Sequence, residues 1–314
     1  MRSGFGTLLT SPPPRSPFHV VRERLEQAGI ERPDVEAWQM LEHVSGTSKL
    51  DWLTRPDLPL GPGDLATLEG LVAGRAAGIP LQHLLGTAPF WGMTLVSTPD
   101  ALVPRPETEG LVALGLHALE GRAAPVVLDL GTGSGAIAIA IAVERPDAEV
   151  WASERSAAAV QLAETNFATH APNVRLVQAD LLDRADLREL AFRLDLLIAN
   201  LPYLPDADAE ALPAEVKHDP PEALFGGSDG LDLFRRAWQQ ADALLPPNAC
   251  AVFELDPRNV RDAATWLARR PNGAARRVTI EADLAGRERF LVVGQLSGAP
   301  SPPNRGERPG EVGS

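Results

Sequence analysis

The sequence predicts an α/β protein whose main domain is a seven-stranded, mostly parallel sheet, preceded by a small helical domain. Residues 18–85 place apolar side chains at helical spacing, whereas short runs of Val, Ile and Leu alternate with helical stretches from residue 125 onward. Strands that are apolar on both faces are typical of a parallel sheet covered by helices. A chain of 314 residues is also long enough for two compact units.

Composition excludes several classes of protein. The chain has 29 basic and 42 acidic residues and a formal net charge of −13, which disfavours binding to nucleic acid mainly by neutralising phosphates. Its one cysteine cannot form an intrachain disulfide, which fits a reducing compartment. The only lysines, Lys49 and Lys217, lack the glycine-rich or strand context of a P-loop or a protein kinase. No apolar run could cross a bilayer, so we expect a cytoplasmic protein with no membrane partner.

The two ends of the chain differ in composition from the rest. Residues 1–17 are rich in Pro and Ser and lack the apolar core of a signal peptide, so we expect an untargeted, flexible leader. Residues 297–314 are dominated by Gly, Pro and Ser and predict a flexible tail. Between them we expect a helical substrate-selection domain at 18–85, a β connector at 86–105 and the α/β domain at 106–296.

Three helices are expected in the helical domain, because apolar residues recur there every three or four positions. Their predicted buried residues are Val21, Leu25 and Ala28 in the first helix, Val35, Trp38 and Leu41 in the second, and Leu65, Leu68, Leu71 and Val72 in the third. Asp64 is the expected N-cap of the third helix. This domain carries no catalytic motif, so docking or selection of a substrate is its expected role.

Turn residues and short apolar runs predict a strand pair or connector at 86–105. The α/β domain has seven strand candidates, at PVVLDL, AEVWAS, VRLVQ, DLLIAN, ACAVFEL, RRVTIEA and RFLVVG. Helical stretches lie between most of them, for example at 136–143, 157–169 and 231–245. The last two strands are joined by the short DLAGRE, so we expect that pair to be antiparallel.

The first strand of the α/β domain runs into a turn made of Gly131, Thr132, Gly133, Ser134 and Gly135. Glycine lets the chain turn sharply and lets a ligand approach the backbone. The second strand ends at Glu154, whose carboxylate can accept hydrogen bonds from both hydroxyls of a ribose. Together these features predict a nucleoside cofactor. An NAD-type pattern and S-adenosylmethionine both remain open, and the latter is favoured because it has no pyrophosphate to place at the helix N-terminus.

The fourth strand ends in Asn200, Leu201, Pro202 and Tyr203, where open α/β sheets bind ligand. Methyl transfer to a planar amide or an exocyclic amine requires the nitrogen lone pair to be oriented, and two acceptors that hold the N–H groups can do this. The Asn200 carboxamide oxygen and the Leu201 carbonyl are the candidate acceptors. Pro202 stiffens the turn through its fixed φ, and Tyr203 offers a flat face for stacking.

These motifs resemble the HemK/PrmC family, the protein-(glutamine) methyltransferases that modify peptide chain release factors. The resemblance rests on GIPLQHLLG, FWG, LVPRPETEGLV, VLDLGTGSGAIAIA, the NLPY turn, PPEALFGGSDGL and DLAGRERF. It implies a class I S-adenosylmethionine-dependent methyltransferase domain with a Rossmann-like sheet. The implied substrate is the side-chain amide of the glutamine in the Gly-Gly-Gln motif of class I release factors. The implied cofactor product is S-adenosylhomocysteine.

The resemblance also implies roles for single residues. Those implied to bind the cofactor are Gly131, Thr132, Gly133, Ser134, Gly135, Glu154, Asp180, Leu181 and Asn200, with Asp180 and Leu181 at the adenine. Those implied to be catalytic are Asn200, Pro202 and Tyr203, and Leu201 joins them in binding the substrate. A weaker assignment places Arg105, Glu107, Thr108 and Glu109 in the cleft wall, with a plain helix entry as the alternative.

Three positions depart from the family pattern. Leu201 replaces the first proline of Asn-Pro-Pro-Tyr, Glu154 replaces an Asp, and FELDPRN at 253–259 replaces Glu-Ile-Gly-x-x-Gln. Leu201 leaves the turn less restricted than a proline would. Two alternatives therefore remain: a methyltransferase of an exocyclic amine in nucleic acid, which the lack of a basic stripe disfavours, and a cofactor-binding module with little turnover.

Other patterns predict no additional chemistry. GGSDG at 226–230 matches G-x-S-x-G, but a hydrolase would need a strand before Ser228 and a histidine after it, and His218 is the last histidine. We interpret it as a turn before a helix. The histidines lack the spacing of metal ligands, so no metal site is indicated, and Cys250 lies within an apolar strand.

Overall fold

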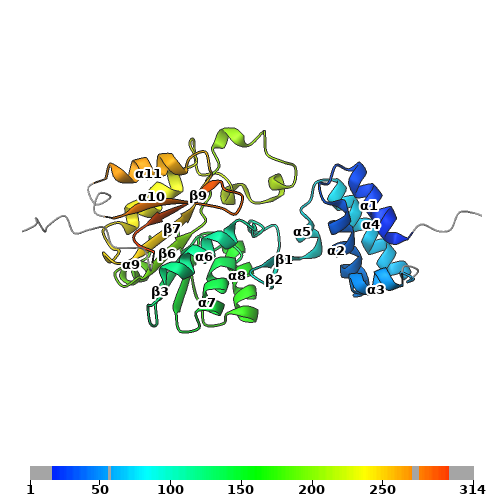
Figure 1. The fold of residues 1–314 in the computed structure, drawn as a ribbon, viewed down its shortest axis with the longest axis horizontal. Coiled ribbons are helices and arrows are strands. Elements are labelled where there is room, and N and C mark those ends of the chain that lie inside the picture. The colour runs from blue at the N-terminus through cyan, green and yellow to red at the C-terminus, as the bar shows by residue number, and fades with distance from the viewer. Residues whose placement is uncertain (1–15, 56–57, 271–275, 297–314) are drawn as a thin grey trace, which may run out of the picture. The chain divides into compact units, whose positions relative to one another are not determined.

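The computed structural model describes residues 16–55, 58–270 and 276–296 (Figure 1). The predicted leader lies outside the described residues except for Ser16 and Pro17, and the predicted tail lies outside them entirely. Two compact units are present. Among the described residues, the helical unit comprises those up to Thr87 together with Pro213–His218, and the sheet unit comprises those of Ala88–Leu212 and those from Asp219 onward.

The helical unit packs its helices around one apolar core. The helices are α1 (Pro17–Gln27), α2 (Pro33–Ser45), α3 (Lys49–Thr54), α4 (Pro62–Ala76) and α5 (Leu81–Leu85). Its core is formed by Val21, Leu25, Ala37, Met40, Leu41, Trp52, Leu68, Leu71, Val72 and Leu81. Buried Arg75 adds an ion pair with Glu36 at 2.7 Å and one with Glu215 at 2.8 Å. Glu215 belongs to the segment 213–218, which the sequence had placed in the α/β domain.

Several predictions for this unit were wrong in detail. Asp64 is not the N-cap of α4, because the helix begins at Pro62, whose fixed φ suits a first turn. Asp64 instead accepts a hydrogen bond from the Gly61 N–H at 3.1 Å. Leu65 is half exposed and Ala28 lies beyond the end of α1 in an exposed position.

The buried face of α2 also differs from the predicted one. It consists of Ala37, Met40 and Leu41, whereas Val35 and Trp38 are only partly buried. Both sets have helical spacing, so periodicity alone could not choose between them. Trp38 is used differently, because its ring stacks on Phe18 with 4.1 Å between ring centroids.

The seven predicted strands are all present in one sheet. They are β3 (Val126–Leu130), β4 (Glu149–Glu154), β5 (Arg175–Gln178), β6 (Leu196–Ala199), β7 (Cys250–Glu254), β8 (Val278–Ala282) and β9 (Glu288–Val293). Their order in the sheet is β5-β4-β3-β6-β7-β9-β8. β3 to β7 run parallel, and β9 is antiparallel to both β7 and β8, which confirms the predicted antiparallel pair. A separate two-stranded sheet pairs β1 (Thr87–Phe90) with β2 (Met93–Val96).

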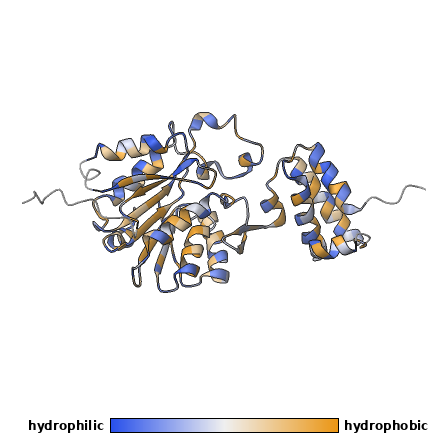
Figure 2. Ribbon diagram, viewed as in Figure 1, coloured by the Kyte–Doolittle hydropathy of each residue, from blue (hydrophilic) through white to orange (hydrophobic). Residues whose placement is uncertain are grey.

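Helices cover both faces of the seven-stranded sheet (Figure 1). One face carries α6 (Thr108–Ala118), α7 (Ala136–Glu144) and α8 (Ala157–His170), and the other carries α9 (Ala185–Ala191), α10 (Asp232–Ala241) and α11 (Val260–Ala268). Residues of β6 alternate between the two cores, with Leu196 and Ile198 on one face and Leu197 and Ala199 on the other. Figure 2 shows the strands as almost continuously hydrophobic, whereas most helices are mixed. Among the described residues, no helix combines the length and hydropathy needed to span a membrane.

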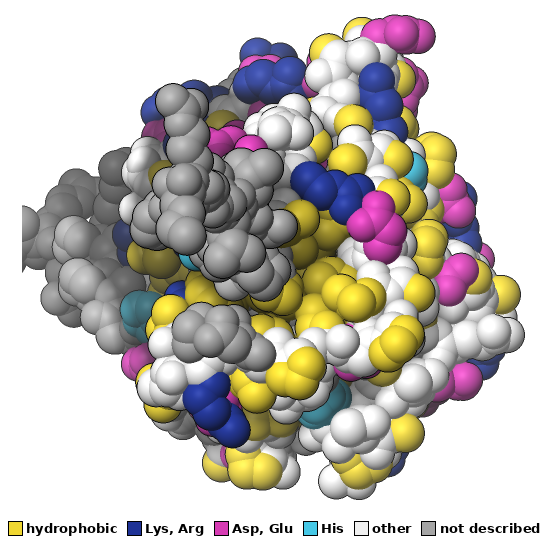
Figure 3. Space-filling view, turned by 90° about the vertical axis from the view of Figure 1, so that its right-hand side faces the viewer, with side chains coloured by type: hydrophobic (Ala, Val, Ile, Leu, Met, Phe, Trp, Pro, Cys, Tyr) yellow, Lys and Arg dark blue, Asp and Glu magenta, His cyan; other side chains and the backbone are white. Residues whose placement is uncertain are grey.

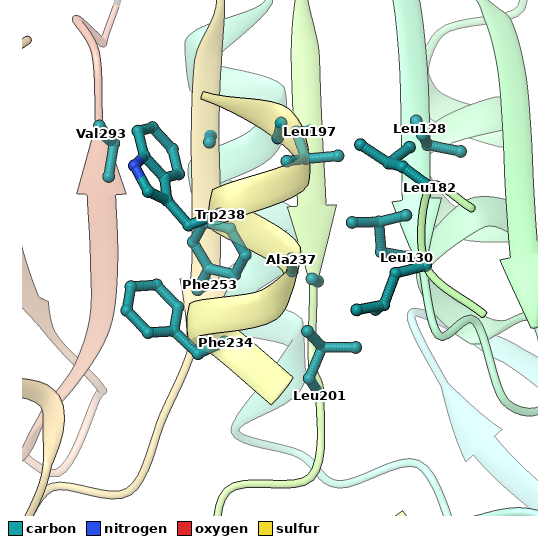
Figure 4. Close-up of a cluster of buried hydrophobic side chains, with 14 of the residues drawn as sticks. Leu128, Leu130, Leu182, Leu197, Leu201, Phe234, Ala237, Trp238, Phe253 and Val293 are labelled. Atoms are coloured by element: carbon teal, nitrogen blue, oxygen red, sulfur yellow. The ribbon is translucent and has the colours of Figure 1, made fainter. Parts of the chain in front are cut away.

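One predicted helix is shorter than expected. α10 ends at Ala241, not at Leu245. Pro246 and Pro247 follow, and the residue before a proline is disfavoured in a helical conformation. Within α10, Phe234 packs edge to face on Phe253 of β7, with ring centroids 5.1 Å apart (Figure 4).

Candidate functional site

The glycine turn follows β3 and is held by the neighbouring strand. The N–H groups of Gly131 and Thr132 both donate to the Ser153 carbonyl, at 2.8 and 3.0 Å. Gly131 has a φ of +69°, and a Cβ atom there would lie 2.8 Å from Cδ2 of Leu201. Both the left-handed backbone and the close approach require glycine at this position.

A buried carboxyl group lies beneath the turn. Asp129, which is fully buried, accepts hydrogen bonds from the Thr132 hydroxyl at 2.6 Å and from the Ala138 N–H at 3.2 Å. Burial raises the pKa of Asp129 to about 7, against the lowering effect of those two hydrogen bonds. Asp129 thus ties the turn to the first residues of α7.

Glu154 reaches the same turn from the end of β4. Its Oε2 accepts a hydrogen bond from the Gly133 N–H at 3.0 Å, and its Oε1 accepts one from the Ser156 N–H at 2.8 Å. The carboxylate therefore lies beside the backbone of the glycine turn, as the spacing in the sequence predicted. An acidic side chain in this position can accept hydrogen bonds from a ribose.

A pocket opens beside the glycine turn and the turn after β6. It brings together eight of the predicted site residues: Gly131, Gly133, Glu154, Asp180, Leu181, Asn200, Leu201 and Pro202. Sequence reasoning missed other lining residues, among them Ala101, Leu102, Arg155, Ser156 and Pro220. Signals were available for four of them, because Arg155 and Ser156 directly follow Glu154 and because Leu102 and Pro220 begin the motifs LVPRPETEGLV and PPEALFGGSDGL, whereas Ala101 belongs to no motif.

The remaining predicted site residues are not among those lining this pocket. Thr132 and Ser134 have buried side chains, and the carbonyl of Ser134 accepts a hydrogen bond from Asn166 at 2.9 Å. At Gly135, a Cβ atom would lie 2.7 Å from the ring of Phe167, so packing against α8 accounts for that glycine. Tyr203 is partly buried and packs against the core on the α10 side of the sheet.

Leu181 combines a buried side chain with an unusual backbone. Its φ of +58° lies in the left-handed region, which costs a non-glycine residue free energy. Such strain persists where the surrounding structure imposes it and is frequent at ligand sites. Next to it, Asp180 forms an ion pair with Arg236 of α10 at 2.7 Å.

Asn200 presents one side of its carboxamide to α6 and leaves the other free. Its Nδ2 donates to the Thr108 hydroxyl oxygen at 3.1 Å. Neither Asn200 Oδ1 nor the Leu201 carbonyl accepts a hydrogen bond from any residue that the structure describes. Because Asn200 and Leu201 both line the pocket, two hydrogen-bond acceptors are available at the end of β6.

The side chain of Leu201 is not free in the pocket. It is 5% exposed and lies in the core beneath α10, near Leu130 and Ala237 (Figure 4). The leucine that replaces the usual proline is therefore anchored by packing, although its backbone is less restricted than that of proline.

A loop before α10 clamps the turn from the other side. The Leu204 N–H donates to the Leu224 carbonyl and the Gly226 N–H donates to the Leu204 carbonyl, each at 2.9 Å. Gly230 has a φ of +76°, and a Cβ atom there would collide with the Tyr203 carbonyl. The GGSDG motif is thus a turn that leads into α10, as interpreted, and it supports the turn after β6.

Asn259, the last residue of FELDPRN, joins these two loops. Its Nδ2 donates to the Tyr203 carbonyl at 3.0 Å and to the Asp229 carbonyl at 3.2 Å. Asn259 is buried and occupies the N-cap position of α11, and its side chain makes no capping hydrogen bond there. The departure from the family pattern at 253–259 therefore still provides a tight connection after β7.

Glu254, at the end of β7, is buried behind the turn. Burial raises the pKa of its carboxyl group to about 7, and hydrogen bonds from Thr108 and Tyr203 oppose that rise. Burial, followed by the nearby charge of Glu254, raises the pKa of the Tyr203 hydroxyl above its ordinary value. Sequence reasoning did not identify Glu254 as a site residue, although Glu254 lies in the segment FELDPRN at 253–259 that it singled out.

The PRPETE segment mainly makes contacts outside the pocket. Arg105 pairs with buried Asp219 at 2.7 Å, and Glu109 accepts a hydrogen bond from the Trp91 N–H at 2.7 Å. Glu107 lies 3.5 Å from Arg287 and is the N-cap residue of α6. These contacts favour the helix-entry interpretation for three of the four residues, whereas Thr108 contacts Asn200.

Both the helical part and the α/β part of the chain match models of known protein families. Residues 18–86 match the family model of the PrmC N-terminal domain, and residues 112–218 match the model of the methyltransferase small domain. The release factor glutamine methyltransferase of Deinococcus radiodurans is 40% identical over 268 residues, which cover 85% of this chain and 93% of that protein. The protein of the same name from Bordetella pertussis is 39% identical over 86% of this chain and 97% of its own length. The chain therefore belongs to the release factor glutamine methyltransferase family.

Proposed function

We propose that this protein transfers a methyl group from S-adenosylmethionine to the side-chain amide nitrogen of the glutamine in the Gly-Gly-Gln motif of class I release factors. The observation that carries the proposal is the pair of free acceptors, Asn200 Oδ1 and the Leu201 carbonyl, in the pocket that also contains the glycine turn. Relatives that align over most of their length bear the name release factor glutamine methyltransferase.

The residues of the pocket fit S-adenosylmethionine. Glu154 provides a carboxylate for the ribose hydroxyls, and Gly131 and Gly133 offer backbone without a Cβ atom beside the methionine part. Asp180 and Leu181 line the same pocket, and we assign them to the adenine. When bound, this cofactor supplies an electrophilic methyl group on its sulfonium sulfur and leaves as S-adenosylhomocysteine.

The turn after β6 positions the amide nitrogen. Asn200 Oδ1 and the Leu201 carbonyl accept the two N–H groups of the glutamine amide, and this fixes the direction of the nitrogen lone pair. Pro202 limits the backbone freedom of the turn. Since the amide proton becomes acidic once the nitrogen is alkylated, the site needs no strong general base. Orientation is then the main contribution of the protein to the rate.

Tyr203 contributes in a different way from the one predicted. It is not among the residues lining the pocket, its ring packs against the core on the α10 side of the sheet, and its carbonyl accepts a hydrogen bond from Asn259. We therefore propose that Tyr203 holds the turn in place, and that any stacking on the substrate requires the ring to become more exposed than it is here.

The two units have separate roles in this proposal. The helical domain, at about residues 18–85, selects the release factor, and the domain at 106–296 performs the chemistry. Release factors act on ribosomes, so the reaction takes place in the cytoplasm.

The test is mass spectrometry of a class I release factor incubated with the protein and S-adenosylmethionine. We expect a mass gain of one methyl group on the glutamine of the Gly-Gly-Gln peptide, and a far slower gain with an Asn200→Ala variant. Methylation of another residue, or none despite calorimetric binding of the cofactor, would refute the proposed substrate.

Parallel assays with RNA and DNA test the alternative acceptor, an exocyclic amine. The net charge of −13 disfavours a polyanionic substrate. Among the described side chains drawn in Figure 3, Lys and Arg lie among acidic and apolar groups and form no continuous band. We expect no methyl transfer to either nucleic acid.

A further inference from the structure

A second groove lies at the same edge of the sheet as the turn after β6. It has a volume of about 600 Å³ and is bounded by the first turns of α6, by Trp91 and by the loop between β8 and β9, and we call it the α6–β9 groove. β6 and β7 are parallel and β9 is antiparallel to β7, so β9 begins at the edge where β6 ends. The loop before β9 therefore lies at the carboxyl edge of the sheet, as Asn200 does.

The α6–β9 groove and the turn after β6 both adjoin the first turn of α6. The Thr108 hydroxyl oxygen accepts the hydrogen bond from Asn200 Nδ2 at 3.1 Å, and Glu107 and Glu109, on either side of Thr108, line the groove. No residue that lines the groove also lines the pocket at the glycine turn. The two are separate hollows that meet at the residue that holds Asn200.

The order of the strands gives the two halves of this edge different tasks. Gly131, Glu154 and Asp180, at the ends of β3, β4 and β5, line the pocket proposed for the cofactor, and these strands lie on one side of β6. β7, β9 and β8 lie on the other side. In-line methyl transfer requires the acceptor nitrogen to lie opposite the sulfonium sulfur. A polypeptide that presents its glutamine at Asn200 therefore extends over the half that carries the groove.

Aromatic and apolar side chains of Trp91, Leu114 and Phe290 line the groove. Trp91 has a φ of +51° in the two-residue turn between β1 and β2, where Asn and Gly are the usual residues. Its indole Nε1 donates to Glu144 at 2.8 Å, and its backbone N–H donates to Glu109 at 2.7 Å. A tryptophan held on a strained backbone at the border of a groove indicates that its ring serves a contact.

The loop between β8 and β9 displays a second apolar side chain at the groove. Leu284 is fully exposed, so packing within the sheet unit does not account for it. The loop around it is ordered by Asp283, whose carboxylate accepts from the N–H groups of Ala285 and Arg287, each at 2.9 Å, and from Arg289 Nε at 3.2 Å. A side chain on a preorganised loop loses little conformational entropy when a partner covers it.

Acidic side chains outnumber basic ones around the groove. Glu107, Glu109, Glu281 and Asp283 line it, and Arg287 is the one basic residue among the described residues that do so. Arg287 lies 3.5 Å from Glu107 and 3.3 Å from Asp283, so it is shared between two of the four acids. The N-terminal dipole of α6 offsets only about half a charge. The excess of negative charge favours a basic partner.

We propose that the α6–β9 groove binds the polypeptide that flanks the target glutamine, and that it selects a flank with basic residues and an apolar side chain that packs against Leu284 and Trp91. This inference rests on the proposed function, and it adds where the protein substrate docks and which chemistry it must carry there. The acidic lining disfavours a nucleic acid at the same place.

The first test is Leu284→Ser, which leaves the core intact because the side chain is exposed. We expect the KM for an intact class I release factor to rise about five- to tenfold. The kcat and the calorimetric Kd for S-adenosylmethionine should stay within about twofold. Methylation of a short peptide that contains only the Gly-Gly-Gln motif should not change, because this peptide lacks the flank.

Phe192→Ser is the matched control for that variant. Phe192 is also an exposed apolar residue of the sheet unit, but it follows α9, on the opposite face of the sheet from α6. The KM for the release factor should be that of the wild type. Equal KM increases for Phe192→Ser and Leu284→Ser would contradict a specific contact at the groove.

The second test is Glu281→Lys, which reverses a charge in the groove lining. We expect the KM for the release factor to rise about tenfold at low ionic strength, and to depend less on salt than in the wild type. The matched control, Glu189→Lys on α9, changes the net charge by the same amount and should leave the KM nearly unaltered. An equal rise in both variants would assign the effect to net charge and overturn the groove.

The outcomes separate this inference from the proposed function. If the wild-type protein does not methylate the release factor, the proposed function fails, and this inference fails with it. If it does, and Leu284→Ser and Glu281→Lys keep the wild-type KM, the docking site is wrong although the function stands. An equal loss with the short peptide would also overturn the inference, since the turn after β6 would then be disturbed. A changed oligomeric state in either variant, measured by analytical ultracentrifugation, would instead assign the groove to a second copy of this chain.

Discussion

The two turns that form the pocket differ in how far along the sequence their most distant hydrogen-bond partners lie. The glycine turn after β3 is held by the next strand and by its own neighbours, since Ser153 accepts from its backbone and Asp129 from Thr132. The turn after β6 is held by residues far away in the sequence: Asn200 is bonded to Thr108, 92 residues earlier, and Tyr203 to Asn259, 56 residues later. A turn that mainly shapes a pocket can be encoded locally. A turn that must orient a reacting group is instead supported by several elements at once.

The strongest test of this contrast is Asn200→Ala. It removes one of the two acceptors that we propose for the substrate amide, and it leaves the glycine turn untouched. We expect kcat to fall by about 10²- to 10³-fold, as for the loss of a hydrogen bond that acts in the transition state. The Kd for S-adenosylmethionine, measured by calorimetry, should change by less than about threefold. A loss of cofactor affinity without a loss of kcat would contradict this role and would assign Asn200 to cofactor binding, as for the glycine turn.

The distant support of the second turn is tested by Gly230→Ala. A Cβ atom at Gly230 would collide with the Tyr203 carbonyl, so the turn after β6 must shift. We expect kcat to fall by about 10- to 100-fold. The matched control is Gly286→Ala, which has a nearly identical φ of +77° but no atom within 4 Å of the added Cβ.

Both substitutions put a side chain on a left-handed backbone, which costs roughly 1–2 kcal/mol. Only Gly230→Ala adds the collision with the Tyr203 carbonyl. Thermal unfolding should therefore show a lower Tm for both variants, with a kcat loss confined to Gly230→Ala. Equal kcat losses in the two variants would show that the contact with Tyr203 is unimportant.

Elements that depend on neighbouring residues were the ones that could be predicted from the sequence. The seven strands were predicted because each is a short apolar run with its own signal, and the glycine turn because Gly131 and Glu154 follow two such strands directly. Errors arose where two local signals competed, as at Asp64, where Pro62 begins the helix earlier.

The support of the second turn could not be predicted for a physical reason. Asn259, which follows β7, reaches the turn only because β7 lies beside β6 in the sheet, and strand order is not visible in a single sequence. Thr108 was noticed as part of PRPETE, but its partner Asn200 depends on how α6 packs on the sheet. The partial burial of Tyr203 likewise follows from tertiary packing, and its stacking on the substrate stays a prediction.

For the glycine turn, we expect Glu154→Gln to have a smaller effect, and one on cofactor affinity instead of on kcat. In glutamine one carboxylate oxygen and the negative charge are lost. The remaining oxygen can accept from only one of the two N–H groups that Glu154 holds, that of Gly133 or that of Ser156. We expect the Kd for S-adenosylmethionine to rise about tenfold while kcat at saturating cofactor stays nearly unchanged. Glu149→Gln, at the opposite end of β4, is the control and should leave Kd unaltered.

The smallest effect on turnover is expected at Leu201, where the two turns meet. Its N–H donates no hydrogen bond to the described residues, so Leu201→Pro removes none and restricts φ in the turn. The cost is to packing, because the leucine side chain is buried beneath α10 and lies close to Gly131.

We therefore expect Leu201→Pro to keep kcat within about threefold and to lower the free energy of unfolding, by an amount comparable to the roughly 2 kcal/mol or more lost in Leu201→Ala. Urea unfolding and release factor methylation measure the two effects separately. If both variants lost turnover together with cofactor affinity, the leucine side chain would be a support of the glycine turn. The glycine turn after β3 would then depend on the turn after β6. The two turns would differ only in how much distant residues support them.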